Sequence, residues 1–225
     1  DTLQSFGSGP IAPDGTFSVT GVTPGTYIAY GTAVGPEGAN RFGTAPVSVS
    51  GDDVDGVLLV LGPGGSARGR VVFEPQVVSD FAPDSLTPFT MPRGYDRVPV
   101  GRGIGHVNDD WTFEIRGMDG PQLVRLSGLR REWQIRTVAL AGRDITDVPI
   151  VFPTRTPTTG VQIVLTNRLT TLTGVVVDSR GQPATDYTAL IFAEDEARWV
   201  FPSRFIRAAR PDQRGAFTVR GLPPA

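Results

Sequence analysis

The residues that could do chemistry in this chain are one histidine and a few groups of acidic side chains. A Ser–His–Asp triad would have to use His106, which follows the glycine-rich stretch 101–105. We predict that His106 is an exposed loop residue and not a catalytic base. A zinc site needs three or four nitrogen, sulfur or oxygen ligands, and the chain has one histidine and no cysteine. We therefore expect no metal site of this kind.

The acidic groups are the second candidates. Asp109–Asp110 and Glu194–Glu196 could act as the paired carboxylates of a glycosidase. The same residues, with Asp52, Asp53 and Asp55, could bind Ca²⁺, although no Asp-x-Asp-x-Asp-Gly loop with a distal glutamate is present. Acidic clusters at strand ends are usually solvated turn residues. We predict that the chain is not an enzyme and has no cofactor, and the sequence leaves calcium binding open.

Aromatic residues near the end of the chain are candidate ligand contacts. Trp199, Phe201 and Phe205 lie in an arginine-rich stretch, residues 199–210. Sugar rings stack on flat apolar faces, so this group could bind a glycan. Large aromatic side chains are mostly buried in folded proteins. We therefore favour the interpretation that Trp199 covers the edge of a β-sheet.

The composition excludes several classes of protein. Of the 225 residues none is cysteine and none is lysine, so disulfides, Schiff-base chemistry and lysine-based crosslinks are excluded. A formal net charge of −2 gives no reason to expect nucleic acid or an anionic membrane as a partner. The sequence contains no apolar run of about 18 residues, so it predicts no membrane span. The 28 glycines and 20 prolines favour a turn-rich, all-β chain.

One strand pattern occurs three times and organises the rest. The copies are Phe17-x-Val19, Phe113-x-Ile115 and Phe217-x-Val219, each followed two residues later by glycine. Strict alternation predicts strands with these residues inward and with Glu114 and Thr218 outward. The copies lie 96 and 104 residues apart, which is the size of a small domain.

A second pattern sets the boundaries of the modules. Gly69–Phe73 recurs 105 residues later as Gly174–Asp178. We predict that Val71 and Phe73, and likewise Val175 and Val177, point into a core. The modules are then residues 1–66, the C-terminal part of a β-sandwich; 67–168, a complete one; and 169–225, the N-terminal part of a third. Residues 62–66, rich in glycine, are expected to form a hinge.

The remaining strands follow from apolar runs between turn residues, and no window has the period of a helix. We expect strands at 16–20, 26–33, 45–50, 57–61, 67–73, 86–91, 111–116, 122–127, 133–139, 161–166, 169–177 and 187–193. Residues 199–210 are expected to be a loop.

These motifs resemble the carboxypeptidase regulatory-like domain. The resemblance is carried by Thr173–Pro183, by Phe217–Pro224 and by Pro24-Gly25-Thr-Tyr27. The stretches 142–149, 203–204 and 210–212 are similar to tandem modules of large bacterial, often acidobacterial, surface proteins. The resemblance implies seven-stranded Ig-like or transthyretin-like (Cna-B-like) β-sandwiches without catalytic activity. The chain departs from pilin-type relatives because it has no lysine for an isopeptide bond.

The expected function is therefore a structural or adhesive segment of a multi-module extracellular or cell-surface protein or fibre, with the periplasm as an alternative location. The alternative function is a set of glycan-binding modules attached to an enzyme outside this segment. The expected partners are adjacent modules of a longer chain, or head-to-tail neighbouring copies, with a glycan as a further candidate. Truncated sheets expose unpaired edges, so we expect both end segments to be completed by other polypeptide. Because both carry the Phe-x-Val strand, exchange between copies would supply one strand twice, which favours the longer chain.

Overall fold

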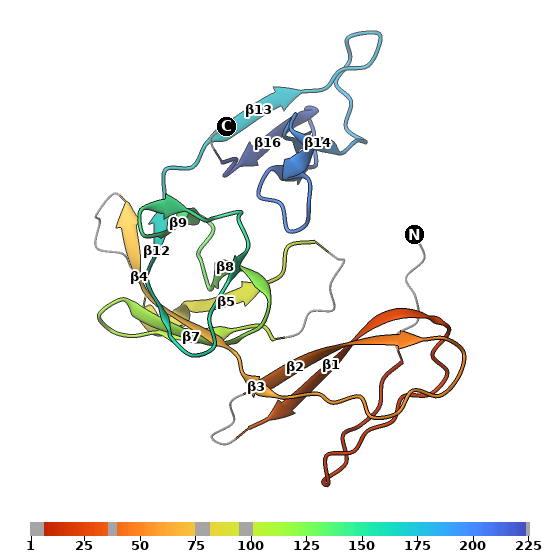
Figure 1. Cartoon of the computed structure of the whole chain (residues 1–225). Helices are drawn as coiled ribbons and strands as arrows, with labels where there is room; N and C mark the ends of the chain where they lie inside the picture. Colours follow the sequence, from red (N-terminus) through yellow and green to blue (C-terminus); the bar gives the residue numbers. More distant parts are fainter. Residues whose placement is uncertain (1–6, 36–39, 75–81, 95–100, 224–225) are drawn as a thin grey trace.

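The computed structural model describes residues 7–35, 40–74, 82–94 and 101–223, and its regular structure is almost entirely β-strand (Figure 1). Among these described residues, two short 3₁₀ turns, η2 (Pro83–Ser85) and η3 (Glu196–Arg198), interrupt the strands. The predicted all-β class is confirmed. Within the described residues no helix has the length and apolar character needed to cross a membrane.

The middle of the chain forms one sheet of nine strands in the order β10-β9-β12-β4-β7-β6-β5-β8-β11. All neighbours are antiparallel except β12 and β4, which run parallel. The strands are β4 (Gly65–Glu74), β5 (Thr87–Met91), β6 (Ile104–Val107), β7 (Thr112–Met118), β8 (Pro121–Ser127), β9 (Gln134–Leu140), β10 (Arg143–Asp144), β11 (Ile150–Val151) and β12 (Thr158–Thr166).

This sheet curls around a single core. Val71 of β4 and Ile163 of β12, in one half of the sheet, belong to the same buried cluster as Val124 of β8 in the other half. Leu86, just before β5, belongs to this cluster too. The alternation predicted for β7 is confirmed, because Phe113 and Ile115 are buried. Burial of each such side chain stabilises the fold by about 1.5–3 kcal/mol. The middle segment is called closed below, in the sense that the two halves of its sheet bury one common core.

Phe73 departs slightly from the prediction. It is half-buried and not fully buried, and it lies at the margin of the core. Its ring makes edge-on contacts with Trp111 at 4.7 Å and with Trp133 at 5.4 Å between ring centroids. The two tryptophans thus complete its apolar environment.

The last segment contains two strand pairs. The strand β13 (Thr171–Val175) pairs with β16 (Ala216–Arg220), and β14 (Ala189–Phe192) pairs with β15 (Ile206–Ala209). Val219 is buried and Thr218 exposed, as predicted, while Phe217 is half-buried. The strand β15 lies in the stretch expected to be a loop, which corrects that prediction.

The predicted burial of Val175 and Val177 is wrong, since these side chains are 61% and 53% exposed. The reason is the register. Gly174 pairs with Phe217 as Gly69 pairs with Phe113, so the counterpart of Val71 is Val176. A shift of one residue moves every side chain to the other face of a strand.

The first segment is a long hairpin with a loosely attached flank. The strands β1 (Gly25–Val34) and β2 (Asn40–Val49) pair over ten residues, and β3 (Gly62–Pro63) pairs with β2. The strand expected at 16–20 is reduced to one bridge between Ile11 and Phe17. The apolar run 57–61 forms no ladder and lies across the hairpin, with Leu59 and Leu61 over Gly31.

The hinge expected at residues 62–66 is a paired passage. Gly62 and Pro63 pair with β2, and Gly65 and Ser66 pair with β7 two residues later. Backbone hydrogen bonds on both sides of Gly64 therefore restrain a stretch whose composition favours flexibility.

The three Phe-x-Val motifs share their backbone turns. Two residues before each phenylalanine φ is positive: 87° at Gly15, 66° at Trp111 and 71° at Gly215. Four residues after each phenylalanine φ is positive again: 73° at Gly21, 81° at Gly117 and 73° at Gly221. In each preceding turn an aspartate carboxylate accepts backbone N–H bonds, and these residues are Asp14, Asp110 and Asp212. Backbone bonds chiefly lower the pKa of Asp14 and Asp212, whereas the pKa of Asp110 is lowered first by the hydroxyl of Thr112 and then by the backbone.

Candidate functional site

The most elaborate polar arrangement lies where the middle segment meets the last one. Asp147 accepts hydrogen bonds from two arginines, Arg125 of β8 and Arg204 of the loop before β15. Arg204 Nη2 lies 2.7 Å from Asp147 Oδ2, and its Nε lies 3.1 Å from the same oxygen. Arg125 Nη2 lies 3.2 Å from Oδ1. One carboxylate thus joins both segments, and this cluster is called the Asp147 bridge below.

A tight turn places Asp147 at this point. Ala141 and Gly142 both have positive φ, which closes the hairpin between β9 and β10. Asp144 Oδ1 then accepts a bond from the backbone N–H of Thr146, whose hydroxyl accepts one from the N–H of Val138 at 2.8 Å. Because Thr146 is buried and bonded on both sides, the following residue is held at the surface in one position.

The Asp147 bridge is partly withdrawn from water. The exposed fractions of the side chains are 11% for Arg125, 22% for Arg204 and 31% for Asp147. Burial lowers the pKa of Arg125, and the charge of Asp147 opposes that shift. Arg125 Nη1 also donates to the carbonyls of Val124 and Thr146, so its guanidinium is held by the backbone of its own sheet. Charge-assisted bonds of this kind contribute about 1.5–3 kcal/mol each.

Two further hydrogen bonds join the same segments. Arg93 Nη2, in the turn after β5, donates to the carbonyl of Ala197 at 2.6 Å. The N–H of the next residue, Gly94, donates to the carbonyl of Phe201 at 2.5 Å. The last segment is therefore attached at three points between residues 197 and 204. These contacts fix the orientation of the last segment relative to the middle one. Among the residues that make them, no nucleophile lies beside a base.

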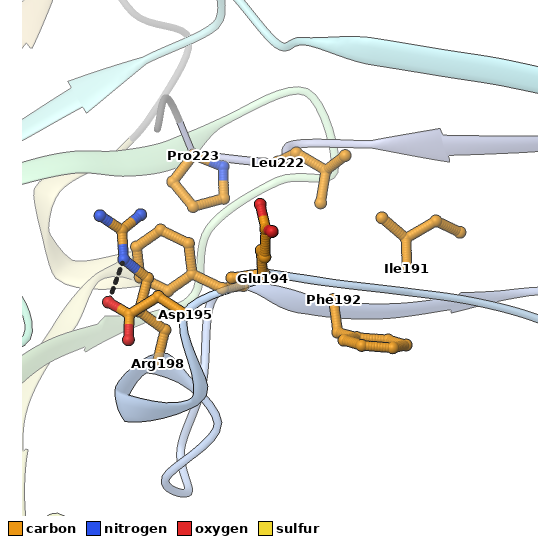
Figure 2. A pocket seen from close by; sticks show the side chains of 9 residues that line it. Ile191, Phe192, Glu194, Asp195, Arg198, Leu222 and Pro223 are labelled. Carbon is orange, nitrogen blue, oxygen red and sulfur yellow. Dashed lines mark ion pairs between the residues drawn. The ribbon is translucent and has the colours of Figure 1, made fainter.

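A groove beside β14 is the second candidate site. Figure 2 shows Leu222 and Pro223 on one side of it, Ile191 and Phe192 of β14 on the other, and the ion pair of Asp195 with Arg198 at one end. Its volume is about 570 Å³, and it is open to solvent. Most of its lining is apolar, and Phe205 contributes its ring. Such a groove suits an extended apolar segment better than a small polar substrate.

The predicted ligand residues are only partly brought together. Phe205 lines the groove, with the guanidinium of Arg198 4.6 Å from its ring centroid. Trp199 is 41% exposed; its ring meets Phe192 edge-on at 5.3 Å, and its N–H donates to the carbonyl of Ala193. Phe201 is 46% exposed and lies outside the groove lining.

The other candidates do not converge. His106 is exposed, as predicted, but it lies in β6 opposite Glu114 and not in a loop. Asp110 and Asp195 each bond the backbone of their own turn. No group of three metal-ligating side chains occurs in the part of the chain that the structure describes. The stretch 101–105 leads into β6, where Gly103 pairs with Thr90 through both backbone and hydroxyl.

The Asp147 bridge could not be assembled from the sequence, although two of its three members, Asp147 and Arg204, lie in stretches named above. Asp147 and Arg204 lie 57 residues apart, in different modules. Both stretches resemble those of tandem modules in large surface proteins. Opposite charge in two such stretches was the one available signal, and the chain has many charged residues that would satisfy it.

The first segment meets the middle one through aromatic side chains. Phe42 is buried, and its ring lies next to Gly101. The nearby hydroxyl of Tyr30 is buried without a hydrogen-bond partner among the described residues. Burial, together with the negative charge of Asp119, raises the pKa of Tyr30. The contact between the first and middle segments is therefore mainly apolar, whereas the contact between the middle and last segments is ionic.

Comparisons with known proteins add no functional information, because no family model, no curated protein and no solved structure matches the chain.

Proposed function

We propose that this chain is a non-catalytic structural or adhesive segment of a multi-module extracellular or cell-surface protein or fibre. The observation that carries the proposal is the Asp147 bridge, which holds two successive strand groups in a fixed orientation. A carboxylate shared between a guanidinium of its own sheet and one of the following segment contributes little to a single domain. It contributes directly to the stiffness of a row of domains.

The repeated turns support the same proposal. Each Phe-x-Val motif has its positive-φ residues at the same positions, as expected of copies of one module. We propose that the modules are seven-stranded, Ig-like or transthyretin-like β-sandwiches, of which residues 67–168 are one complete example and the flanking segments are partial ones. The adjoining modules, in the same protein or in neighbouring copies, are the partners.

Asp147→Asn tests the mechanical part of the proposal. The cysteine-free chain allows spin labels at Thr154→Cys and Ser179→Cys, one on each side of the joint. In the parent we expect a narrow distribution of label-to-label distances by pulsed electron paramagnetic resonance. The neutral amide at position 147 loses the charge-assisted bond with Arg204, so the distribution should broaden.

The matched control is Glu114→Gln, which removes ion pairs to Arg68 and Arg116 within the middle sheet. It should leave the distance distribution narrow. Equal widths in the parent and Asp147→Asn would refute the joint as the source of stiffness. For the location, an antibody against the chain should label intact source cells, and labelling only after lysis would contradict a surface protein.

Glycan binding is a second candidate function, because Trp199 and Phe201 expose 41% and 46% of their surface in one loop. An exposed indole ring is a platform on which a sugar ring can stack. Trp199→Ala should reduce retention on a glycan array at least tenfold, which corresponds to about 1.4 kcal/mol. Val175→Ala, which removes an exposed apolar side chain outside that loop, should leave retention unchanged. Absence of binding by the parent chain would refute this candidate.

A further inference from the structure

Two sheet edges of this chain correspond to strands that are partners in its closed middle segment. By position after the Phe-x-Val motif, β1 corresponds to β8: they begin eight residues after Phe17 and Phe113. The pair of β13 with β16 corresponds to the pair of β4 with β7. Since β14 is the first strand after β13 and β5 is the first after β4, β14 is the counterpart of β5. In the middle segment β5 and β8 are antiparallel neighbours.

Both counterparts have a free edge. Among the described strands β1 pairs with β2 alone, and β14 pairs with β15 alone. Each therefore presents a row of backbone donors and acceptors to which another strand can be added. The hairpin β1–β2 does not need to open for this, because β2 occupies the opposite edge of β1.

The side chains match as well as the edges. Val124 of β8 is 2% exposed because it enters the core that also contains Met118. Its counterpart in β1, Ile28, is 67% exposed. The counterpart of Met118 is Leu222, which lines the groove beside β14. The last segment thus has an open groove at the place where the middle segment receives apolar side chains of β8. The first segment has a matching apolar side chain, Ile28, which is exposed.

The charges of the two end segments favour their association. Residues 1–66 contain six acidic residues and one arginine, whereas residues 169–225 contain seven arginines and six acidic residues. Opposite net charge accelerates encounter and is screened by salt.

In an exchange between copies, the first segment would not supply a second copy of β16, the Phe-x-Val strand of the last segment. Its own Phe-x-Val motif forms only the bridge between Ile11 and Phe17, whereas the motif of the last segment forms β16. This removes the main objection, drawn from the sequence, to exchange between copies.

We propose that β1 of one copy adds antiparallel to the free edge of β14 of a second copy, with Ile28 seated in the groove beside β14. This names the partner in the structural role proposed above and rests on that role. The contact joins two different surfaces, so its repetition gives a head-to-tail chain unless the rotation between copies closes a ring or a reciprocal dimer.

The full chain tests this by its mass as a function of concentration, measured by sedimentation velocity. We expect a weight-average mass that rises past that of a dimer with increasing concentration and falls when salt is added. A monomer over the whole range would overturn the inference. The distance distribution across the Asp147 bridge would be unaffected by that result, so the proposed function would stand or fall separately.

Matched variants locate the contact. Ile28→Asp and Ile191→Asp place a charge on each side of it, because Ile191 lines the groove, and should lower the association constant at least a hundredfold. Val34→Asp lies on the same face of β1, beyond the paired register, and Val175→Asp lies on β13; both positions are also exposed and should associate like the parent. Because none of the four side chains is fully buried, circular dichroism should be unchanged. Equal loss in all four variants would overturn the proposal.

Single cysteines test the direction of assembly. Chains with Ile28→Cys and chains with Ile191→Cys, mixed and treated with a short bismaleimide, should give mainly the mixed dimer. A mixture of Val34→Cys with Ile191→Cys should give little. Crosslinking of Ile28→Cys with itself as the main product would indicate a symmetric dimer through β1 and would refute the head-to-tail arrangement.

Discussion

At the scale of the residue, Trp111 combines a favourable ring contact with an unfavourable backbone. Its φ of 66° lies in the left-handed region that Gly15 and Gly215 occupy in the other two copies of the turn. Its ring packs edge-on against Phe73. A non-glycine residue in this region costs about 1–2 kcal/mol, and the ring contact offsets that cost.

We therefore expect Trp111→Ala to be less stable than Trp111→Gly by about 1 kcal/mol. Both variants lose the ring, but only the alanine retains the cost of the left-handed backbone. Urea unfolding of the two proteins, followed by the fluorescence of the remaining tryptophans, measures the difference. If the alanine variant is as stable as the glycine variant, the backbone at residue 111 carries no strain.

At the scale of the element, the sequence predicted where the strands lie better than it predicted which of their side chains point into the core. Periodicity located the buried pair Phe113 and Ile115, because a strand covered on one face alternates strictly. The run Val175–Val177 has no alternation of its own, and its alignment with Gly69–Phe73 makes Val176 the counterpart of Val71, in agreement with the pairing of Gly174 with Phe217. Apolar content alone could not place residues 57–61, which contain no polar residue to mark an outer face.

The candidate site was less accessible to sequence reasoning than the strands. The aromatic loop was identified from composition, and Phe205 does line the groove beside β14. The Asp147 bridge depends on a tertiary contact across 57 residues, and no spacing rule predicts such a pair. The local rule that does hold is the aspartate turn, which bonds Asp144 to Thr146 and so positions Asp147.

At the scale of the whole molecule, the chain joins one closed core to two open strand groups, and its stability should be distributed accordingly. Two stretches of similar composition make the comparison direct. Residues 161–165 read Val-Gln-Ile-Val-Leu, and residues 57–61 read Val-Leu-Leu-Val-Leu. The first stretch pairs with β4 on one side and β9 on the other, and Val161, Ile163 and Leu165 are completely buried. The second forms no ladder, and Leu58 is 77% exposed.

Backbone hydrogen exchange, followed by mass spectrometry at a protein concentration low enough to keep the chain monomeric, should separate the two stretches. Amides of 161–165 should exchange only when the middle segment unfolds, an opening that costs about 5–15 kcal/mol in a typical domain. Amides of 57–61 should exchange within the earliest time points, because side-chain packing over the hairpin does not bond their N–H groups. Slower exchange at 57–61 as the concentration rises would indicate that assembly covers this flank. Equal protection of the two stretches in the monomer would show that the first segment has a closed core of its own, and would contradict the division into one closed and two open groups.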